Sequence, residues 1–248
     1  MKYVIANWKM YTTVYQAVAL VVEIQEGLRR RADRGAILPL PIICPPFVSL
    51  APLRALADRR LLALGAQNCH WEPEGPHTGE ISPAMLVGLV DYVLLGHSDR
   101  RAAGETDEHI ARKVAAASAQ GLVPILFVGE DQPDDDAIKS SDERLRHGVS
   151  RIDLETQPVV VVYEPAWAIG AEEPADVEHV RAVVEHLKAR LHDLGAPNPE
   201  VVYGGTVTDE NIRQFVDPGV LDGVGATRAA LDADGFLAMV DQVATRAR

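Results

Sequence analysis

Strand-like apolar runs and stretches with helical periodicity alternate eight times along this chain of 248 residues. Right-handed crossovers bring successive parallel strands side by side, so eight such units predict a closed parallel barrel of the α/β class. The length lies close to the roughly 250 residues typical of a (β/α)8 barrel. No low-complexity linker divides the chain, and we predict a single (β/α)8 barrel domain over residues 1–248. A doubly wound open sheet is the alternative, but the glycine-rich turn of a dinucleotide site does not follow the first strand-like run.

The expected elements follow one another in regular order. Strands are expected at residues 3–7, 37–44, 61–66, 92–95, 123–128, 159–162, 201–203 and 221–225. Helices are expected at residues 15–30, 46–57, 106–120, 138–154, 175–194, 208–215 and 236–244. Ser82 and Pro83 should open one more helix as its N-cap and first-turn residues. The connection at 67–78 exceeds the usual loop length, so we expect it to do more than join two elements.

Four consecutive valines at 159–162 form the most apolar of these runs. A run without polar alternation is typical of a strand that is buried on both faces of a parallel sheet. Glu164 follows the run, and Pro165 cannot extend a strand ladder, so the chain must turn outward there. A carboxylate at a strand end, followed by an Ala- and Gly-containing segment, predicts a reacting group beneath a lid. Taken alone, Glu164 could equally be a structural carboxylate paired with an arginine.

The charge balance limits the possible partners. The chain carries 24 Lys and Arg residues against 36 Asp and Glu residues, for a formal net charge of −12. Such a surface repels nucleic acid and anionic membranes, so neither is an expected partner. It also repels an anionic metabolite, so a phosphate site would have to be built locally from helix amino ends and a few cations.

The cysteines and histidines indicate neither a disulfide framework nor a metal site. Cys44 and Cys69 match no metal spacing and favour a reducing cytoplasm. His70 and His77 have no carboxylate or cysteine partner at ligand spacing, so no metal is expected. The remaining histidines outside the strand ends are expected to be ordinary surface groups on helices: His109, His147, His179, His186 and His192. No stretch of about 18 apolar residues and no signal-like start occurs, so we expect neither a membrane span nor export.

Side chains that suit proton transfer follow several predicted strands. Asn7 and Lys9 end the first strand, His97 follows the fourth, Glu164 the sixth, and a glycine-rich run at 203–207 ends the seventh. The carboxyl ends of all strands of a (β/α)8 barrel meet at one face, so these residues should converge. A base, an imidazole, a cation and an amide suit proton transfer between the two carbons of an α-hydroxycarbonyl compound through an enediolate. Backbone N–H groups of the glycine-rich turns could hold a phosphate.

Five motifs resemble the triosephosphate isomerase family and occur in the family's order. They are Ala-Asn-Trp-Lys-Met at 6–10, Thr-Gly-Glu-Ile-Ser at 78–82, Gly-His-Ser at 96–98, Tyr-Glu-Pro-Ala-Trp-Ala-Ile-Gly at 163–170 and Tyr-Gly-Gly-Thr-Val at 203–207. Each motif alone is weak, but together they span residues 6–207. The resemblance implies a TIM barrel without a cofactor that acts on a small phosphorylated sugar. It also implies a homodimer in which the long loop around Thr78 reaches into the partner's active site.

The resemblance also implies roles for individual residues. Glu164 would be the base, His97 the neutral electrophile, Lys9 the cation that favours anionic substrate and transition state, and Asn7 a hydrogen-bonding group. Members of this family use a glutamate base, a neutral histidine and a closing loop, so these roles are carried over from the family.

Further residues would support the chemistry or hold phosphate. The supporting set is Ser98, Asp99, Arg100 and Glu105, of which the last two would form a structural pair beneath the site. The implied phosphate contacts are Gly170, Thr206, Val207, Thr227 and Arg228.

The sequence departs from the family pattern at four places. Asp99 stands where the family generally has a glutamate that orients the lysine, so the charge is retained with less reach. Residues 127–128 are Phe-Val where many members have Cys-Ile, which mainly affects packing. After Gly170 the lid continues as Ala-Glu-Glu-Pro and is shorter, and we expect its two glutamates, Glu172 and Glu173, to face solvent because they would repel phosphate.

The fourth departure is the largest and bears on the substrate. Thr227 and Arg228 replace two adjacent glycines whose amides touch phosphate in the triose enzymes. An arginine can grip phosphate through its planar fork, but it also fills volume. If Arg228 points outward instead, only Thr227 lines the site.

The shorter lid and Arg228 together resemble the branch of the family that isomerises four-carbon erythrulose phosphates and erythrose 4-phosphate. We therefore predict a four-carbon substrate, with dihydroxyacetone phosphate and glyceraldehyde 3-phosphate as the alternative. Two remoter alternatives are a Schiff-base aldolase that uses Lys9 and a barrel without enzymatic activity that serves as a scaffold. Asp99 near Lys9 would favour the protonated amine and thus argues against the aldolase.

Overall fold

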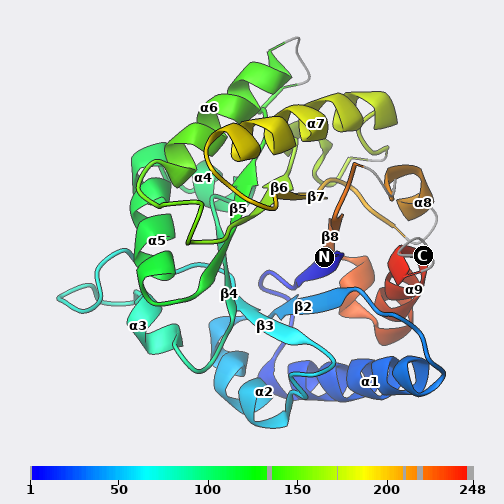
Figure 1. Ribbon diagram of the computed structural model, residues 1–248. Helices are drawn as coiled ribbons and strands as arrows, with labels where there is room; N and C mark the ends of the chain where they lie inside the picture. Colours follow the sequence, from blue (N-terminus) through cyan, green and yellow to red (C-terminus); the bar gives the residue numbers. More distant parts are fainter. Residues whose placement is uncertain (1, 133–135, 172, 209–210, 217–219, 245–248) are drawn as a thin grey trace.

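The chain folds into a closed barrel of eight parallel strands in the order β1 to β8. The computed structural model describes residues 2–132, 136–171, 173–208, 211–216 and 220–244. Figure 1 shows the helices arranged around the outside of the strands, with the first strand next to the last. The predicted single-domain (β/α)8 fold is therefore confirmed.

The strands are short and paired in parallel register. Their bounds are β1 Tyr3–Asn7, β2 Leu40–Cys44, β3 Ala63–Ala66, β4 Tyr92–Leu95, β5 Val123–Val128, β6 Val160–Tyr163, β7 Glu200–Tyr203 and β8 Gly223–Ala226. The barrel closes where Tyr3 of β1 pairs with Gly223 of β8. A Cβ atom on Gly223 would collide with the Tyr3 backbone, so the closure requires glycine at this position.

The helices alternate with the strands. Their bounds are α1 Val14–Asp33, α2 Leu50–Leu56, α3 Pro83–Leu86, α4 Ser98–Ala102, α5 Asp107–Ala119, α6 Ala137–Val149, α7 Val177–Asp193, α8 Ile212–Phe215 and α9 Ala233–Ala244. Three 3₁₀ turns add to these: η1 Phe47–Ser49, η2 Ala166–Ala168 and η3 Ala229–Leu231. Within the described part of the chain, the membrane-span criteria of length and apolarity are met by none of the helices.

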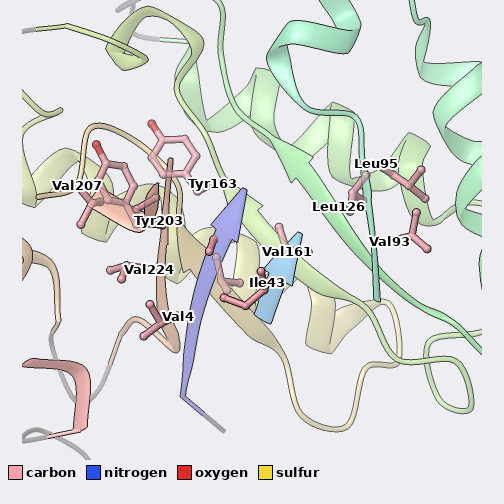
Figure 2. Close-up of a cluster of buried hydrophobic side chains, with 14 of the residues drawn as sticks. Val4, Ile43, Val93, Leu95, Leu126, Val161, Tyr163, Tyr203, Val207 and Val224 are labelled. Carbon is pink, nitrogen blue, oxygen red and sulfur yellow. The ribbon is translucent and has the colours of Figure 1, made fainter. Parts of the chain in front are cut away.

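The valine run shows how the strands divide the core. Val160 and Val162 belong to the cluster inside the barrel, which also holds Ile5, Ile42 and Leu94. Val161 and Tyr163 point the other way, into the cluster between strands and helices. Figure 2 shows part of that outer cluster, with Val161 and Tyr163 beside residues of neighbouring strands. Both faces of β6 are buried, which confirms the prediction from the unbroken apolar run.

Helix starts follow the capping residues that the sequence offers. Ser82 accepts a hydrogen bond from the Met85 N–H, and Pro83 is the first residue of α3, as predicted. Thr106 and His109 form a capping box at the start of α5. Each cap satisfies N–H groups that would otherwise lack an intrahelical partner.

The predicted bounds were wrong at several places. The second strand starts at Leu40 instead of residue 37, because Pro39, just before it, cannot donate to the ladder. α6 ends at Val149 instead of residue 154, where the Ser150 hydroxyl donates to the His147 carbonyl at 2.7 Å and competes with the next helical turn. The helix predicted at 208–215 is described only as Ile212–Phe215, and residues 209 and 210 lie outside the described residues. The short helix α4, directly after β4, was not predicted.

Candidate active site

A cavity of about 260 Å³ opens at the carboxyl ends of the strands. Ile5, Phe127 and Val162 form its apolar floor. One side, here called the polar end, carries the four side chains predicted to be catalytic: Asn7, Lys9, His97 and Glu164. They come from β1, the start of α4 and the end of β6, so the barrel brings together residues that are far apart in sequence.

Glu164 is buried, with 5% of its surface exposed. Its Oε2 accepts a hydrogen bond of 2.8 Å from the Ser98 N–H, and its Oε1 lies 3.1 Å from Nε2 of His97. Burial raises the pKa of Glu164 to about 7, although the Ser98 hydrogen bonds and the Lys9 charge oppose the shift. A carboxyl group with this pKa can both take up and release a proton near neutral pH.

The strand end beside Glu164 leaves no room for side chains. A Cβ atom on Gly129 would collide with the carbonyl group of Glu164, and one on Gly204 would lie 2.5 Å from Val162. Glycine at both positions therefore lets β5 and β7 approach the residue that carries the carboxylate.

His97 caps α4 through its ring. Its Nδ1 accepts a hydrogen bond of 3.0 Å from the Asp99 N–H. A ring nitrogen that accepts a hydrogen bond carries no proton, so the hydrogen lies on Nε2 and points to Glu164. Burial lowers the pKa of His97 to about 4, and the Lys9 charge adds to this while Asp99 opposes it. The imidazole is therefore neutral at pH 7.

Lys9 is held in an unusual backbone conformation, with φ at +44°. Its N–H donates to Oδ1 of Asn7 at 3.1 Å, and its carbonyl accepts from Nε2 of Gln67 at 2.8 Å. These two contacts compensate for the strain of the left-handed region. Nζ of Lys9 lies 3.0 Å from Oδ2 of Asp99. Asp99 thus reaches the lysine despite its shorter side chain, and the loss of reach inferred from the sequence does not prevent the contact.

Arg100 and Glu105 form the structural pair that was predicted beneath the site. Nε of Arg100 donates to Oε1 of Glu105 at 2.8 Å, and Nζ of Lys113 lies 2.5 Å from the same oxygen. Burial by itself would raise the pKa of Glu105, but the hydrogen bonds from Lys113 and Arg100 hold it below its usual range. Glu105, in the connection between the two helices, thus links Arg100 of α4 to Lys113 of α5.

A second part of the cavity lining, here called the loop end, is made of loop residues. Gly170, Ala171, Thr206, Thr227 and Arg228 line it. Val207 lines the cavity as well, so all five predicted phosphate contacts lie there. Oγ1 of Thr206 donates to the Ala168 carbonyl at 2.6 Å. This bond connects the loop after β7 to the segment between Glu164 and Ala175, here called the covering segment because its residues 169–171 line the cavity. Arg228 is exposed and lines the cavity together with Thr227.

Thr78 lies away from this cavity. It is exposed in the long connection between β3 and α3, which projects from the barrel in Figure 1. Its predicted contact with a partner subunit stays a prediction.

The segment that follows Glu164 is held by a residue for which no role was predicted. Glu130, two residues past the end of β5, is buried, and its Oε1 accepts hydrogen bonds from the Trp167 Nε1–H at 2.8 Å and from the Tyr163 hydroxyl at 2.9 Å. At the other end of the segment the Ala175 N–H donates to the Tyr203 hydroxyl at 3.3 Å. A Gly-Glu pair at a strand end marks Glu130 as a strand-end residue, but its partners could not be read from spacing.

The remaining predictions, on charged residues and histidines, have mixed outcomes. Glu173 is exposed as expected, and Glu172 lies outside the described residues. His147 and His192 are exposed, as predicted for ordinary surface groups. The prediction is wrong for the other three, which are half-buried: His109 belongs to the capping box of α5, His179 is bonded to Tyr163, and His186 is bonded to Asp142. In the residues that the structure describes, no cluster of three or more His, Cys, Asp or Glu side chains could hold a metal ion.

Comparison with known proteins gives a consistent result. The family model described as triosephosphate isomerase matches residues 2–243. A protein of Chloroflexus aurantiacus named triosephosphate isomerase is 40% identical over 245 residues, which cover 94% of this chain and 96% of that protein. The protein of the same name from Herpetosiphon aurantiacus is 38% identical over 244 residues, covering 94% and 96%. That of Carboxydothermus hydrogenoformans is 36% identical over 248 residues, covering 96% and 97%.

Proposed function

The chain belongs to the triosephosphate isomerase family, whose members interconvert aldose and ketose phosphates, and we propose that its substrates are dihydroxyacetone phosphate and glyceraldehyde 3-phosphate. The names of the relatives favour the three-carbon pair over the four-carbon substrate expected from the sequence. The observation that carries the proposal is the contact of 3.1 Å between Glu164 and a neutral His97 inside one cavity.

In the proposed reaction Glu164 takes the proton from the carbon next to the carbonyl group. The C–H electron pair forms the carbon–carbon double bond of an enediolate, and the carbonyl oxygen receives the negative charge. Glu164 then returns the proton to the neighbouring carbon, while the hydroxyl proton passes to the other oxygen. To act, its carboxylate must exchange the hydrogen bond from Ser98 for the substrate carbon, which the adjoining cavity allows.

His97 and Lys9 would stabilise the enediolate oxygen. The Nε2–H of His97 points to Glu164. When substrate is bound, it would donate its hydrogen bond to the substrate oxygen instead. The ammonium group of Lys9, 23% exposed at the edge of the cavity, would supply positive charge. Donors that are fixed before the reaction stabilise developing charge without the cost of reorganising solvent.

Replacing the proposed base is the direct test. Glu164→Gln removes the proton acceptor with little change in volume, and kcat on dihydroxyacetone phosphate should fall by a factor of about 10²–10⁴. Glu143→Gln, an exposed residue on α6, is the matched control and should leave kcat unchanged. Unchanged turnover in Glu164→Gln would remove this residue from the mechanism.

A four-carbon sugar phosphate is the second candidate, supported by one observation. Thr227 and Arg228 both line the loop end of the cavity, where the triose enzymes present two glycines. Comparing kcat/KM on L-erythrulose 1-phosphate, D-erythrulose 4-phosphate and dihydroxyacetone phosphate separates the candidates. A value highest by far on an erythrulose phosphate would replace the three-carbon proposal, and a value highest on the triose would remove the four-carbon one.

The pairing of Lys9 with Asp99 argues against an aldolase, because a Schiff base needs a neutral amine. Trapping with borohydride in the presence of a keto-sugar phosphate should therefore yield no adduct on Lys9. An adduct found by mass spectrometry would overturn the isomerase mechanism.

We also propose that the chain forms a homodimer in the cytoplasm. The projecting, exposed connection around Thr78 supports the dimer, and the two buried free cysteines, Cys44 and Cys69, agree with a reducing compartment. Sedimentation equilibrium would test the dimer, and a single species of 26.9 kDa would refute it.

A further inference from the structure

The Glu130 carboxylate is an anchor point for the covering segment, yet it is poorly neutralised. Its side chain is 2% exposed. Its carboxylate accepts hydrogen bonds from the Trp167 and Tyr163 side chains. Its main-chain carbonyl also holds the segment, because it accepts the Ala166 N–H at 2.9 Å. A buried carboxylate is costly unless a positive charge or enough hydrogen-bond donors compensate for it. Within the described residues, the only basic side chain within 4.0 Å of Glu130 is His179.

The hydrogens available around the Tyr163 hydroxyl determine which atom of His179 is protonated. The Tyr163 hydroxyl has one hydrogen, which it donates to Glu130 at 2.9 Å. Nε2 of His179 lies 2.9 Å from the same hydroxyl oxygen and 3.4 Å from Oε1 of Glu130. Because the hydroxyl hydrogen is already used, the hydrogen between Tyr163 and His179 must come from the imidazole. His179 therefore donates to Tyr163 through Nε2–H and has the carboxylate within reach.

His179 stands where the covering segment returns to the barrel. It lies in the first turn of α7, where its N–H donates to the N-cap residue Asp176 at 3.0 Å. Its ring lies edge-on to Trp167, with the centroids 6.4 Å apart. Trp167 belongs to η2 at the start of the segment, so one side chain connects the start of the segment to its end. At 32% exposure the imidazole is accessible to solvent, whereas the carboxylate is not.

We propose that His179 is a positioning residue for the segment that covers the active-site cavity. It holds the Tyr163 hydroxyl and the Glu130 carboxylate in the arrangement that keeps the Trp167 indole N–H bonded. Without this contact the carboxylate loses its basic partner and Trp167 becomes free to leave. Because Ile169, Gly170 and Ala171 follow Trp167 and line the cavity, loosening the segment changes how readily it closes over a ligand. The kinetic consequence rests on the proposed isomerase function, but the structural consequence does not.

The structural consequence is measured on the unliganded chain by the exchange rate of the Trp167 indole N–H with solvent. Tryptophan labelled with ¹⁵N gives one indole signal for each tryptophan, and Trp167→Phe identifies the signal of interest. His179→Leu removes the donor, and exchange should become faster by up to about tenfold, the size expected when one hydrogen bond is lost. His179→Asn keeps a polar group that is too short to reach Tyr163, and it should behave like His179→Leu.

Two further variants separate positioning from a general structural effect. His179→Gln places an amide donor near the position of Nε2 and should return the indole exchange rate to within about threefold of the original chain. His186→Leu is the matched control, since His186 lies on the same helix, is similarly exposed and also bonds a carboxylate, that of Asp142 at 2.8 Å. It should leave the indole exchange rate unchanged.

Turnover then distinguishes the two proposals. In His179→Leu, kcat and KM for dihydroxyacetone phosphate should both change by several-fold, because hinge contacts act on closure, and His179→Gln should restore them. If no sugar phosphate is turned over but the indole effect is present, the proposed function fails and the positioning role stands. An indole exchange rate that is the same in the original chain, His179→Leu and His179→Asn overturns the positioning role whatever the turnover.

Discussion

The polar end and the loop end of the active-site cavity are held in different ways. At the polar end, His97 and Glu164 are buried, and each accepts a backbone N–H in addition to the contact of 3.1 Å between them. At the loop end, Arg228 and Gly170 are exposed, and the covering segment is attached mainly through Trp167 and Thr206.

The difference matches where the sequence keeps the family motifs and where it departs from them. The polar end retains the residues that the proton transfer needs, and its one exchange, Asp99, still reaches Lys9. The large departures, a shorter lid and Thr227-Arg228, all fall at the loop end. We infer that the polar end determines the reaction and that the loop end determines which sugar phosphate is accepted. Four predictions test this distinction between the polar end and the loop end.

Of these four predictions, the one at His97 has the largest expected effect. His97→Gln removes the ring donor that would stabilise the enediolate, and kcat should fall by a factor of about 10²–10³, as for other single donors to a developing oxyanion. Steady-state kinetics on dihydroxyacetone phosphate measures it. The matched control, His192→Gln, alters an exposed histidine on α7 and should leave kcat unchanged. A loss smaller than threefold for His97→Gln would show that the polar end does not carry the chemistry.

The pH dependence of kcat/KM should report Glu164. Only the ionised carboxylate accepts a proton, and burial raises its pKa to about 7. The rate constant should therefore fall about tenfold for each unit of pH below 7 and level off above it. His97, with its pKa lowered to about 4, stays neutral over this range and should add no second limb near neutral pH. A flat profile from pH 5 to 8 would contradict the assignment of Glu164 as the base.

The burial of Glu164 should also lower the free energy of unfolding at high pH. The folded pKa of Glu164 is about 7 against an ordinary value of 4.5, so the folded chain binds the proton more tightly than the unfolded chain. This residue therefore contributes stability below pH 4.5 that is lost as the pH rises through 7. Glu164→Gln should be more stable than the original chain at pH 8, by up to about 3 kcal/mol, and equally stable at pH 4.5.

Urea unfolding at the two pH values would measure this difference. His97 titrates in the opposite sense, because its lowered pKa makes stability rise between pH 4 and 6.5, so the comparison is made within the pair of variants and not across pH. Equal stability of both variants at pH 8 would show that the ionised Glu164 is not destabilised by its surroundings.

The smallest effect is expected at the loop end. Arg228→Gly should raise KM by up to about tenfold and leave kcat nearly unchanged, because an exposed charge contributes to binding more than to chemistry. The ratio of kcat/KM between dihydroxyacetone phosphate and an erythrulose phosphate should change as well. Arg228→Lys keeps the charge and serves as the control. A fall in kcat equal to that of His97→Gln would abolish the distinction between the two ends.

Much of the fold and of the polar end could be predicted because the signals are local. The run at 159–162 predicts a strand buried on both faces, and Ser82-Pro83 predicts the start of α3. The convergence of Asn7, Lys9, His97 and Glu164 follows from barrel topology once the strand ends are known.

The contacts between elements could not be predicted in the same way. His179 has the spacing of an ordinary helix residue, and only the packing of α7 against the end of β6 brings its ring to Tyr163. α6 ends early where the Ser150 hydroxyl donates to the His147 carbonyl, although apolar residues continue to position 154. A periodic pattern encodes neither the packing partners of His179 nor this side-chain contact.

The central claim is that Glu164 carries a proton between the two carbons of the substrate. The most direct measurement is turnover of dihydroxyacetone phosphate in D₂O, with product deuterium located by NMR. We predict carbon-bound deuterium from the solvent in the product of the original chain, and a loss of both turnover and incorporation in Glu164→Gln. Undiminished turnover in Glu164→Gln, with or without deuterium in the product, would contradict the claim.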